Sequence, residues 1–190
     1  MGWYARGGKR AVDIGGASFA LLLLAPLMIL FAIIIRLQDR GPAIFRQVRV
    51  GRFSRPFTLF KFRSMPVSAP NVPSHEARKL AITPFGRMLR RTNLDELPQL
   101  FNVLRGEMSL IGPRPALPTQ VELLRLRETG AVMTQRPGLT GLAQVNAFDG
   151  MTEAQKVEWE RRYVARITFM GDVNIVLRTF VYLLRPPPVY

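Results

Sequence analysis

The chain has 190 residues and a formal net charge of +14, which is enough length for one domain with a real core and favours an anionic partner. It has no cysteine and one histidine, His75, so disulfides, thiolate chemistry and multi-histidine metal sites are excluded. Acid–base or nucleophilic chemistry therefore falls to carboxylates.

A 22-residue run without charge, residues 14–35, follows a short basic N-terminus. As a helix it measures roughly 33 Å, about the thickness of a bilayer core. Pro26 falls in the middle, where it would kink or break a helix. Both flanks are basic, which favours keeping both ends in the cytoplasm. The residues leave two alternatives open: a spanning helix, and a re-entrant helix that breaks at Pro26 and returns.

Two strand-like segments come next, at residues 43–50 and 57–63, and the Gly-Arg-Phe-Ser-Arg-Pro link between them predicts a β-hairpin. Lys61 and Arg63 lie at the end of the second strand. They either keep an edge strand soluble or contact a phosphate. Residues 65–81, which include His75, have the composition of a loop.

Thr83 and Pro84 predict the start of a short helix, with threonine as the cap and proline at the first position. This helix brings Arg90 and Arg91 to the stretch TNLDELPQLFNVLRGEMSLIGPRP, residues 92–115. That stretch places an adjacent carboxylate pair, Asp95 and Glu96, at the mouth of an apolar helical pattern.

The apolar positions of this second helix are Leu94, Leu97, Phe101 and Leu104, and their spacing predicts one buried face. Asn93 is expected to cap it, with Glu96 completing a capping box. Pro98 either kinks the helix or moves its start to about Leu97. Both alternatives put Asp95 at a helix N-terminus, where the macrodipole favours an ionised carboxylate.

Further helices are predicted at residues 120–129, 153–169 and 172–185, with a glycine-bearing loop, residues 136–141, between the first two. The last helix either rests on a bilayer or packs on the core.

Two carboxylates beside arginines indicate a reaction on a phosphate. Asp95 can supply a nucleophilic oxygen, as carboxylates do in aspartyl-phosphate enzymes. Carboxylate oxygens also suit Mg²⁺, which binds through one or two carboxylates together with substrate phosphates. Arg114 lies between two prolines, so its backbone is stiff and its guanidinium is suited to bidentate phosphate binding.

Several motifs together resemble the bacterial sugar transferases, the monotopic phosphoglycosyl transferases that start glycan assembly on polyprenol phosphate. The resemblance covers nearly the whole chain. It rests on Lys9-Arg10 with Asp13, the apolar run with Pro26, GPAIFRQVRVG, KFRSM, LDELPQLFNVLRGEMSLIGPRP and RPGLTGLAQVN. The family carries a re-entrant helix broken at a proline, which favours that alternative here.

The resemblance implies that Asp95 attacks the β-phosphate of a UDP-sugar and expels UMP, and that undecaprenyl phosphate then takes the phosphosugar from the aspartyl intermediate. It implies Mg²⁺ as cofactor, with Asp95 and Glu96 as metal ligands. The candidate substrate-binding residues are Arg90, Arg114, Arg136, Gln144, Lys61 and Arg63. The expected location is the bacterial inner membrane, with the catalytic part facing the cytoplasm and with membrane lipids as further partners.

Four positions depart from the usual family pattern. Ala25 precedes Pro26 where serine is frequent, Asn93 replaces a frequent serine, and Glu160 replaces a frequent aspartate. Phe148 stands where an arginine is usual, so phosphate binding must be shared differently or the sugar pocket differs.

The expected fold is therefore α+β and mostly helical. It comprises a re-entrant membrane helix hairpin in residues 1–40 and a membrane-interface catalytic domain in residues 41–190, built from a small β-hairpin and interfacial amphipathic helices. A homo-oligomer is possible and no nucleic-acid partner is expected. The alternative function is a membrane-anchored basic binding or scaffold protein without catalysis.

Overall fold

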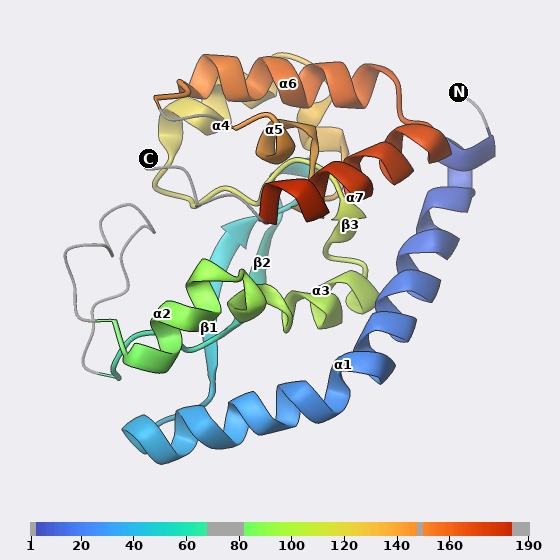
Figure 1. The fold of residues 1–190 in the computed structure, drawn as a ribbon. Helices are drawn as coiled ribbons and strands as arrows, with labels where there is room; N and C mark the ends of the chain where they lie inside the picture. Colours follow the sequence, from blue (N-terminus) through green and yellow to red (C-terminus); the bar gives the residue numbers. More distant parts are fainter. Residues whose placement is uncertain (1–2, 68–81, 148–149, 184–190) are drawn as a thin grey trace.

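The computed structural model describes residues 3–67, 82–147 and 150–183, and it confirms a mostly helical chain with small sheets (Figure 1). The first half comprises η1 (Tyr4–Gly8), α1 (Lys9–Asp39), β1 (Ile44–Val50), η2 (Arg52–Ser54), β2 (Pro56–Phe62), α2 (Pro84–Arg91), η4 (Leu94–Glu96) and α3 (Gln99–Arg105). The second half comprises β3 (Ser109–Ile111), α4 (Val121–Glu128), η5 (Val132–Thr134), β4 (Gly138–Thr140), α5 (Leu142–Val145), α6 (Glu153–Ala165) and α7 (Phe169–Leu183).

Two small sheets connect these helices. β1 and β2 form the predicted antiparallel hairpin, with Ile44 opposite Phe62 and Val50 opposite Pro56, so the predicted strands are correct to within one residue. β3 and β4 form a parallel pair that the sequence analysis did not foresee, because three-residue strands carry no alternating pattern. The helix expected at 120–129 is confirmed as α4.

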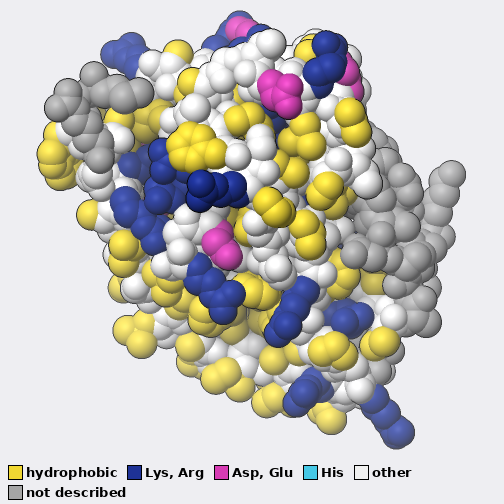
Figure 2. Space-filling view, turned by 180° about the vertical axis from the view of Figure 1, so that it is seen from behind, with side chains coloured by type: hydrophobic (Ala, Val, Ile, Leu, Met, Phe, Trp, Pro, Cys, Tyr) yellow, Lys and Arg dark blue, Asp and Glu magenta, His cyan; other side chains and the backbone are white. Residues whose placement is uncertain are grey.

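Helix α1 runs without interruption through Pro26 and is bent near its middle (Figure 1). It is long and apolar enough to cross a membrane, and no other helix in the described residues is. Only 17% of its apolar window is buried. Its exposed large side chains include Phe19, Leu22, Leu23, Ile29, Leu30, Ile33 and Leu37. Hydrophobic side chains are also spread over the lower part of the face in Figure 2, the end of the molecule where α1 runs. Such a surface is unusual for a protein in water, and the re-entrant insertion stays a prediction.

Both arms of α1 pack against the same body. In the N-terminal arm, Ala17 belongs to a buried cluster with Leu59, Leu100, Val103 and Met108. In the C-terminal arm, Met28, Phe31 and Ile35 belong to another cluster with Ala43, Phe62 and Leu89. Strand β2 contributes to both clusters, since it supplies Leu59 and Phe62. The bend in α1 lets one helix cover two parts of a single core.

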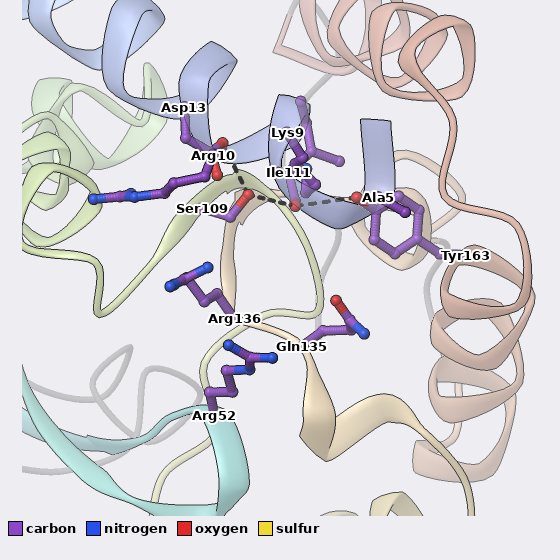
Figure 3. A pocket seen from close by; sticks show the side chains of 11 residues that line it. Ala5, Lys9, Arg10, Asp13, Arg52, Ser109, Ile111, Gln135, Arg136 and Tyr163 are labelled. Carbon is purple, nitrogen blue, oxygen red and sulfur yellow. Dashed lines mark hydrogen bonds between the residues drawn. The ribbon is translucent and has the colours of Figure 1, made fainter. Parts of the chain in front are cut away.

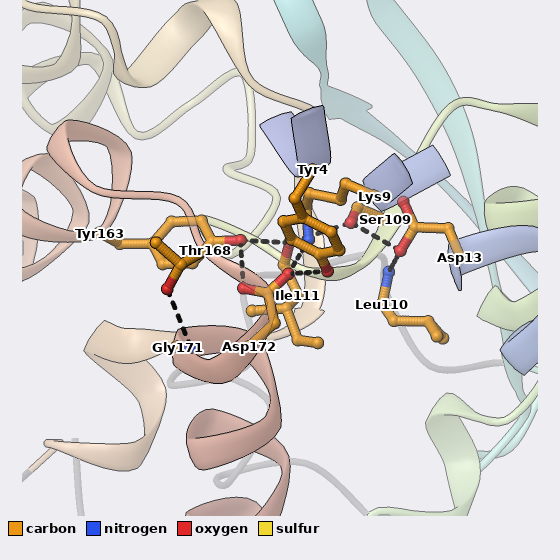
Figure 4. A network of polar contacts seen from close by, with 10 residues as sticks. All are labelled: Tyr4, Lys9, Asp13, Ser109, Leu110, Ile111, Tyr163, Thr168, Gly171 and Asp172. Atoms are coloured by element: carbon orange, nitrogen blue, oxygen red, sulfur yellow. Dashed lines mark hydrogen bonds and ion pairs between the residues drawn. The ribbon is translucent and has the colours of Figure 1, made fainter. Parts of the chain in front are cut away.

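A buried carboxylate, Asp172 of α7, holds the start of α1 (Figure 4). Its Oδ2 accepts hydrogen bonds from the Tyr4 hydroxyl at 2.7 Å and from Lys9 Nζ at 2.6 Å. Its Oδ1 accepts one from the Tyr163 hydroxyl at 2.9 Å. Burial raises the pKa of both phenols and the charge of Asp172 adds to this, so both remain hydrogen-bond donors.

A carboxylate of α1 itself, Asp13, also joins this helix to the rest of the fold. Asp13 is 2% exposed, and its Oδ1 accepts hydrogen bonds from Ser109 Oγ and Leu110 N, each at 2.9 Å (Figure 4). The first turns of α1 are therefore joined by charge-assisted hydrogen bonds both to α7 and to β3.

The predicted apolar face around the carboxylate pair is partly wrong. The α-helix begins only at Gln99, so its buried face contains Leu100 and Val103, while Phe101 is 49% exposed. Leu94–Glu96 form a separate 3₁₀ turn, because Pro98 cannot donate the hydrogen bond that would continue a helix through it. Of the two alternatives, a start just after Leu97 is the closer one.

Asn93 does not act as the expected cap. It adopts the left-handed conformation, with φ at 54°, and its side chain makes no capping hydrogen bond. The predicted capping box is therefore wrong. The prediction at Thr83 is confirmed, because its side chain accepts a hydrogen bond from Gly86 N at 3.0 Å at the start of α2.

The helix predicted at 153–169 ends at Ala165, and α7 begins at Phe169 rather than 172. Arg166 leaves the helical conformation, and Thr168 Oγ1 accepts a hydrogen bond from Gly171 N at 3.0 Å, which caps the new helix. His75, Phe148 and most of the predicted loop at 65–81 lie outside the described residues.

Replacing Asp172 with alanine is expected to destabilise the fold by about 3–5 kcal/mol, because Lys9 loses its counter-charge in a buried site. The measurement is heat and urea denaturation of detergent-solubilised protein. Glu122→Ala is the matched control, since that carboxylate forms only an exposed ion pair with Arg125 and its loss should leave the melting temperature unchanged. Equal melting temperatures for the two variants would show that the Asp172 network does not hold α1.

Candidate active site

Of the two adjacent carboxylates, Glu96 is the one that is hydrogen-bonded to cations. Its Oε1 accepts hydrogen bonds from Lys61 Nζ at 2.7 Å and from Arg114 Nη2 at 2.8 Å. Burial acts to raise the pKa of Glu96, but Arg114 and Lys61 together hold it well below its ordinary value. Glu96 is thus an ionised group that positions two cations from different parts of the chain.

Asp95 is buried at 7% exposure, and its carboxylate accepts no hydrogen bond from any described residue. Burial raises its pKa and the neighbouring charge of Glu96 raises it further, whereas Lys61, Arg90 and Arg114 lower it. The pair therefore contains one carboxylate that is held by cations and one that faces them without being hydrogen-bonded.

Strand β2 and helix α3 are fixed to each other by a buried amide. Asn102 is fully buried, its Nδ2 donates to Thr58 O at 2.7 Å, and its Oδ1 accepts from Phe60 N at 3.1 Å. A buried amide is stable only when its donors and acceptors are paired, so this contact sets the position of α3 along β2. Lys61 follows Phe60 directly, and it is thereby placed to reach Glu96.

Arg90 approaches the carboxylates from α2. Its Nε donates to Ser64 Oγ at 2.7 Å, and burial lowers its pKa while the charge of Asp95 opposes that shift. Helix α2 can lie this close only because residue 86 is glycine: a Cβ there would fall 2.1 Å from the carbonyl oxygen of Ser64. The segment after β2 thus determines where Arg90 points.

Arg114 lies in a loop whose backbone is fixed at three consecutive carbonyls. Pro113 O accepts from Gly138 N at 2.8 Å, Arg114 O from Arg127 Nη2 at 2.9 Å, and Pro115 O from Arg49 Nη1 at 3.1 Å. The Arg114 side chain itself is 47% exposed. A rigid backbone thus carries a half-exposed guanidinium.

The two arginines that hold this loop are both buried. Arg127 forms an ion pair with Glu160, and both side chains are almost completely enclosed. Burial lowers the pKa of Arg49 to about 10, and the nearby charge of Arg114 contributes to this. Glu160, which departs from the family's frequent aspartate, therefore acts on the site through Arg127 and the backbone of Arg114.

Glycines allow β3 and β4 to approach closely next to that loop. A Cβ on Gly112 would lie 2.5 Å from Arg136 O, and one on Gly138 would lie 2.1 Å from Gly112 N. The parallel pairing of Ser109 with Gly138 and of Ile111 with Thr140 depends on this contact. Most of the GPRP and RPGLTG motifs thus serve to build and hold the Arg114 loop.

Three of the predicted substrate-binding residues are not brought to the carboxylates by any contact in the structure. Arg63 donates its Nε to Pro42 O at 2.9 Å, and Arg136 donates its Nε to Gly106 O at 2.8 Å. Gln144 lies on α5, and both polar atoms of its side chain are enclosed without a hydrogen-bond partner. A buried amide of this kind is a group that a ligand or water can pair. Lys61, Arg90 and Arg114 are brought together with the carboxylates, as expected.

The site suits Mg²⁺ only with a substrate present. In the described part of the chain no group of three or more aspartate, glutamate, histidine or cysteine residues is gathered, so a metal cage made of protein alone is absent. Mg²⁺ characteristically needs just one or two carboxylates when phosphates supply the other oxygens. Asp95, whose carboxylate has no hydrogen-bond partner in the described residues, fits that requirement. Its neighbour in the sequence, Glu96, supplies a second carboxylate, of which only Oε1 is used by Lys61 and Arg114.

Residues 4–186 match the bacterial sugar transferase family, and the chain belongs to that family. Family membership and the long apolar α1 together indicate a membrane-associated transferase.

Among the relatives, the UDP-glucose:undecaprenyl-phosphate glucose-1-phosphate transferase of Caulobacter vibrioides is 40% identical over 96% of this chain and 72% of its own length. The UDP-N-acetylgalactosamine-undecaprenyl-phosphate N-acetylgalactosaminephosphotransferase of Aeromonas hydrophila is also 40% identical, over 93% of this chain and 43% of its own. The exopolysaccharide production protein ExoY of Rhizobium meliloti is 35% identical over 90% of this chain and 83% of its own. Several relatives are much longer: the chain spans 39% of the Klebsiella pneumoniae and Escherichia coli glucose-1-phosphate transferases.

Lys61→Gln is expected to raise the pKa of Asp95 further, because it removes the cation that most favours the ionised carboxylate. The measurement is a ¹³C NMR titration of the aspartate side-chain carboxyl in detergent. Arg63→Gln is the matched control: it removes an equal charge two residues away, from a side chain bound to Pro42, and should leave the Asp95 titration unchanged. Equal shifts in both variants would mean that Lys61 has no special place beside Asp95.

Proposed function

We propose that this chain transfers a sugar phosphate from a UDP-sugar to polyprenol phosphate, by way of a covalent aspartyl intermediate. The observation that carries the proposal is the state of Asp95: a buried carboxylate without a hydrogen-bond partner, facing the cations of Lys61, Arg90 and Arg114. The names of the relatives supply the substrate classes, a UDP-sugar and undecaprenyl phosphate.

In the first step an Oδ of Asp95 attacks the β-phosphorus of the UDP-sugar. The bond between that phosphorus and the bridging oxygen breaks, and UMP leaves with the electron pair. The cations oppose the rise that burial causes in the pKa of Asp95, and they attract the phosphate oxygens, which favours the meeting of two anions. Arg114 is suited to hold the substrate, since its exposed fork can bind phosphate oxygens from a fixed backbone.

In the second step a phosphate oxygen of polyprenol phosphate attacks the same phosphorus. The acyl-phosphate bond breaks, Asp95 recovers its carboxylate, and the product is a polyprenol diphosphate sugar. Two displacements at one phosphorus require a carboxylate that is not hydrogen-bonded and that lies close to cations, and Asp95 has both properties.

Mg²⁺, when bound, would neutralise substrate phosphate charge, with Asp95 and Glu96 as its protein ligands. Glu96 also keeps Lys61 and Arg114 in place for the phosphates. Gln144, whose enclosed side-chain amide has no hydrogen-bond partner, is the candidate contact for the sugar.

The packing of α1 supports a re-entrant arrangement. A helix that spans a bilayer separates its ends by the full membrane thickness. Here the first turns are bonded to Asp172 and Ser109, and the far arm packs on Phe62 and Leu89 of the same body. We therefore expect α1 to insert re-entrantly into the cytoplasmic leaflet of the inner membrane. Asp95 then lies at the interface, where a lipid-borne phosphate and a soluble nucleotide sugar can meet.

Asp95→Asn is expected to lower turnover by several orders of magnitude while keeping the fold, because a neutral isostere cannot form the acyl phosphate. Turnover is measured as UMP release from a panel of UDP-sugars with polyprenol phosphate. Glu122→Gln, at an exposed carboxylate of α4, is the control and should retain full activity. Mass spectrometry of wild-type protein with UDP-sugar alone should find the added phosphosugar on Asp95, and an adduct on another residue would refute the assignment.

Activity is expected to require Mg²⁺ or another hard divalent ion, because several negative charges meet at Asp95. Excess EDTA should abolish turnover and added Mg²⁺ should restore it. Electron paramagnetic resonance with Mn²⁺ gives a second readout. With UDP-sugar present, the wild type should bind Mn²⁺ and the Glu96→Gln variant should not. Glu158→Gln, which changes an exposed carboxylate of α6, is the control and should bind Mn²⁺ as the wild type does. Full turnover in EDTA would contradict a metal requirement.

Both ends of α1 are expected to face the cytoplasm. The cysteine-free chain allows single cysteines at Gly7, where a side chain meets no other atom within 4 Å, and at the exposed Gln38. In inner-membrane vesicles of known orientation, an impermeant thiol reagent should label both from the cytoplasmic face. A cysteine at Glu122 reports the side on which the catalytic body lies. Labelling of Gly7→Cys and Gln38→Cys from opposite faces would mean that α1 spans the membrane.

A further inference from the structure

A second basic pocket lies apart from Asp95 and Glu96, at the start of α1 (Figure 3). It is a cavity of about 150 Å³ whose lining brings together η1, the first turn of α1, η2, β3 and the segment before β4. Its polar lining residues are Lys9, Arg10, Asp13, Arg52, Ser109, Gln135, Arg136 and Tyr163. None of the cations that contact the carboxylate pair lines it.

The charges of this pocket do not balance within the described residues. Lys9 is neutralised by Asp172, and Asp13 is used by Ser109 and Leu110. Three cations remain without a carboxylate partner in the described part of the chain: Arg10, Arg52 and Arg136. Burial lowers the pKa of Arg52 and the nearby charge of Arg136 lowers it further, so these two guanidinium groups repel each other.

The arginines are held by backbone carbonyls rather than by anions. Arg10 donates Nη1 to Val103 O at 2.7 Å and Nη2 to Leu104 O at 3.0 Å, and Arg136 donates Nε to Gly106 O. These carbonyls belong to the C-terminal end of α3. A helix terminus carries only roughly −0.5 elementary charge, so it does not compensate three cations.

The terminal guanidinium nitrogens of Arg52 and Arg136 are available to a ligand. Each uses only its Nε, Arg52 toward Thr134 O at 2.7 Å and Arg136 toward Gly106 O at 2.8 Å. The terminal nitrogens make no hydrogen bond to any described residue, and Figure 3 shows both guanidinium groups within the pocket beside Gln135. Two guanidinium groups whose Nε atoms are fixed and whose terminal nitrogens are available match the oxygens of a phosphate.

We propose that this pocket binds a phosphate group, held between the terminal nitrogens of Arg52 and Arg136. The anion relieves the repulsion between the two arginines and occupies a site that the transfer reaction at Asp95 does not use. β3 connects the two places, since Ser109 and Ile111 line the pocket and the strand leads directly to Gly112 and the Arg114 loop. The phosphate belongs either to a free anion or to an anionic lipid headgroup next to α1.

The test is equilibrium dialysis with radiolabelled inorganic phosphate, at constant ionic strength and in EDTA, using full-length protein in a phosphate-free detergent. Wild-type protein should bind phosphate saturably. Arg52→Gln/Arg136→Gln should weaken binding by about tenfold or more, since each removed fork donates charge-assisted hydrogen bonds. Arg125→Gln/Arg162→Gln removes the same charge from exposed ion pairs and should bind as the wild type does.

Arg114→Gln separates the two sites and should leave the binding unchanged. If the double variant of the pocket is unstable, Arg52→Gln alone takes its place, because that side chain is exposed. The proposal is overturned by a lack of saturable binding, by equal weakening in the two double variants, or by binding that is lost in Arg114→Gln and kept in the pocket variant.

Native mass spectrometry identifies the source of the phosphate. Wild-type protein and the Arg52→Gln/Arg136→Gln variant are each released from phosphatidylglycerol nanodiscs, and the lipids that stay bound are counted. If the headgroup fills the pocket, the wild type should retain one lipid more than the variant. Equal lipid counts, together with the dialysis result above, assign the pocket to a soluble anion.

Discussion

Glu96 accepts hydrogen bonds from Lys61 and Arg114 in a buried site, and this pairing leaves Asp95, of the two adjacent carboxylates, without a hydrogen bond. The arrangement links β2, the 3₁₀ turn and the GPRP loop through one side chain. Without it, two cations and two carboxylates at such close quarters would have several alternative pairings. With it, Asp95 faces the cations but is not held by them, which is the state that a nucleophile for phosphate needs.

The long apolar helix α1 and the candidate active site also share one core. Leu59 and Phe62 of β2 pack on the two arms of α1, and Lys61, which lies between them in the sequence, contacts Glu96. One short strand thus joins the apolar support to the candidate site. A shift of α1 would move the same strand that carries Lys61.

The parts that sequence reasoning found are those with a local signal. The hairpin, the cap at Thr83 and the association of Asp95, Glu96, Lys61, Arg90 and Arg114 follow from turn residues, helix-start chemistry and a specific family motif. The helix around Pro98 was misplaced because apolar spacing was extended through a proline. The parallel pair of β3 and β4, the Arg127–Glu160 pair behind Arg114 and the separate location of Arg136 had no local signal. They depend on contacts between residues far apart in the chain, which periodicity cannot show.

The bond from Tyr4 to Asp172 joins residues 168 positions apart. During synthesis the chain is made from its N-terminus, so α1 exists long before α7 can supply the carboxylate for Tyr4 and Lys9. Until α7 has been made, Lys9 at the start of the apolar helix lacks the carboxylate of Asp172. An anionic membrane surface attracts such a positive charge. In the re-entrant arrangement that we propose, the order of synthesis brings α1 to the bilayer first, and α7 supplies the carboxylate for Tyr4 and Lys9 only when the last helix has been made.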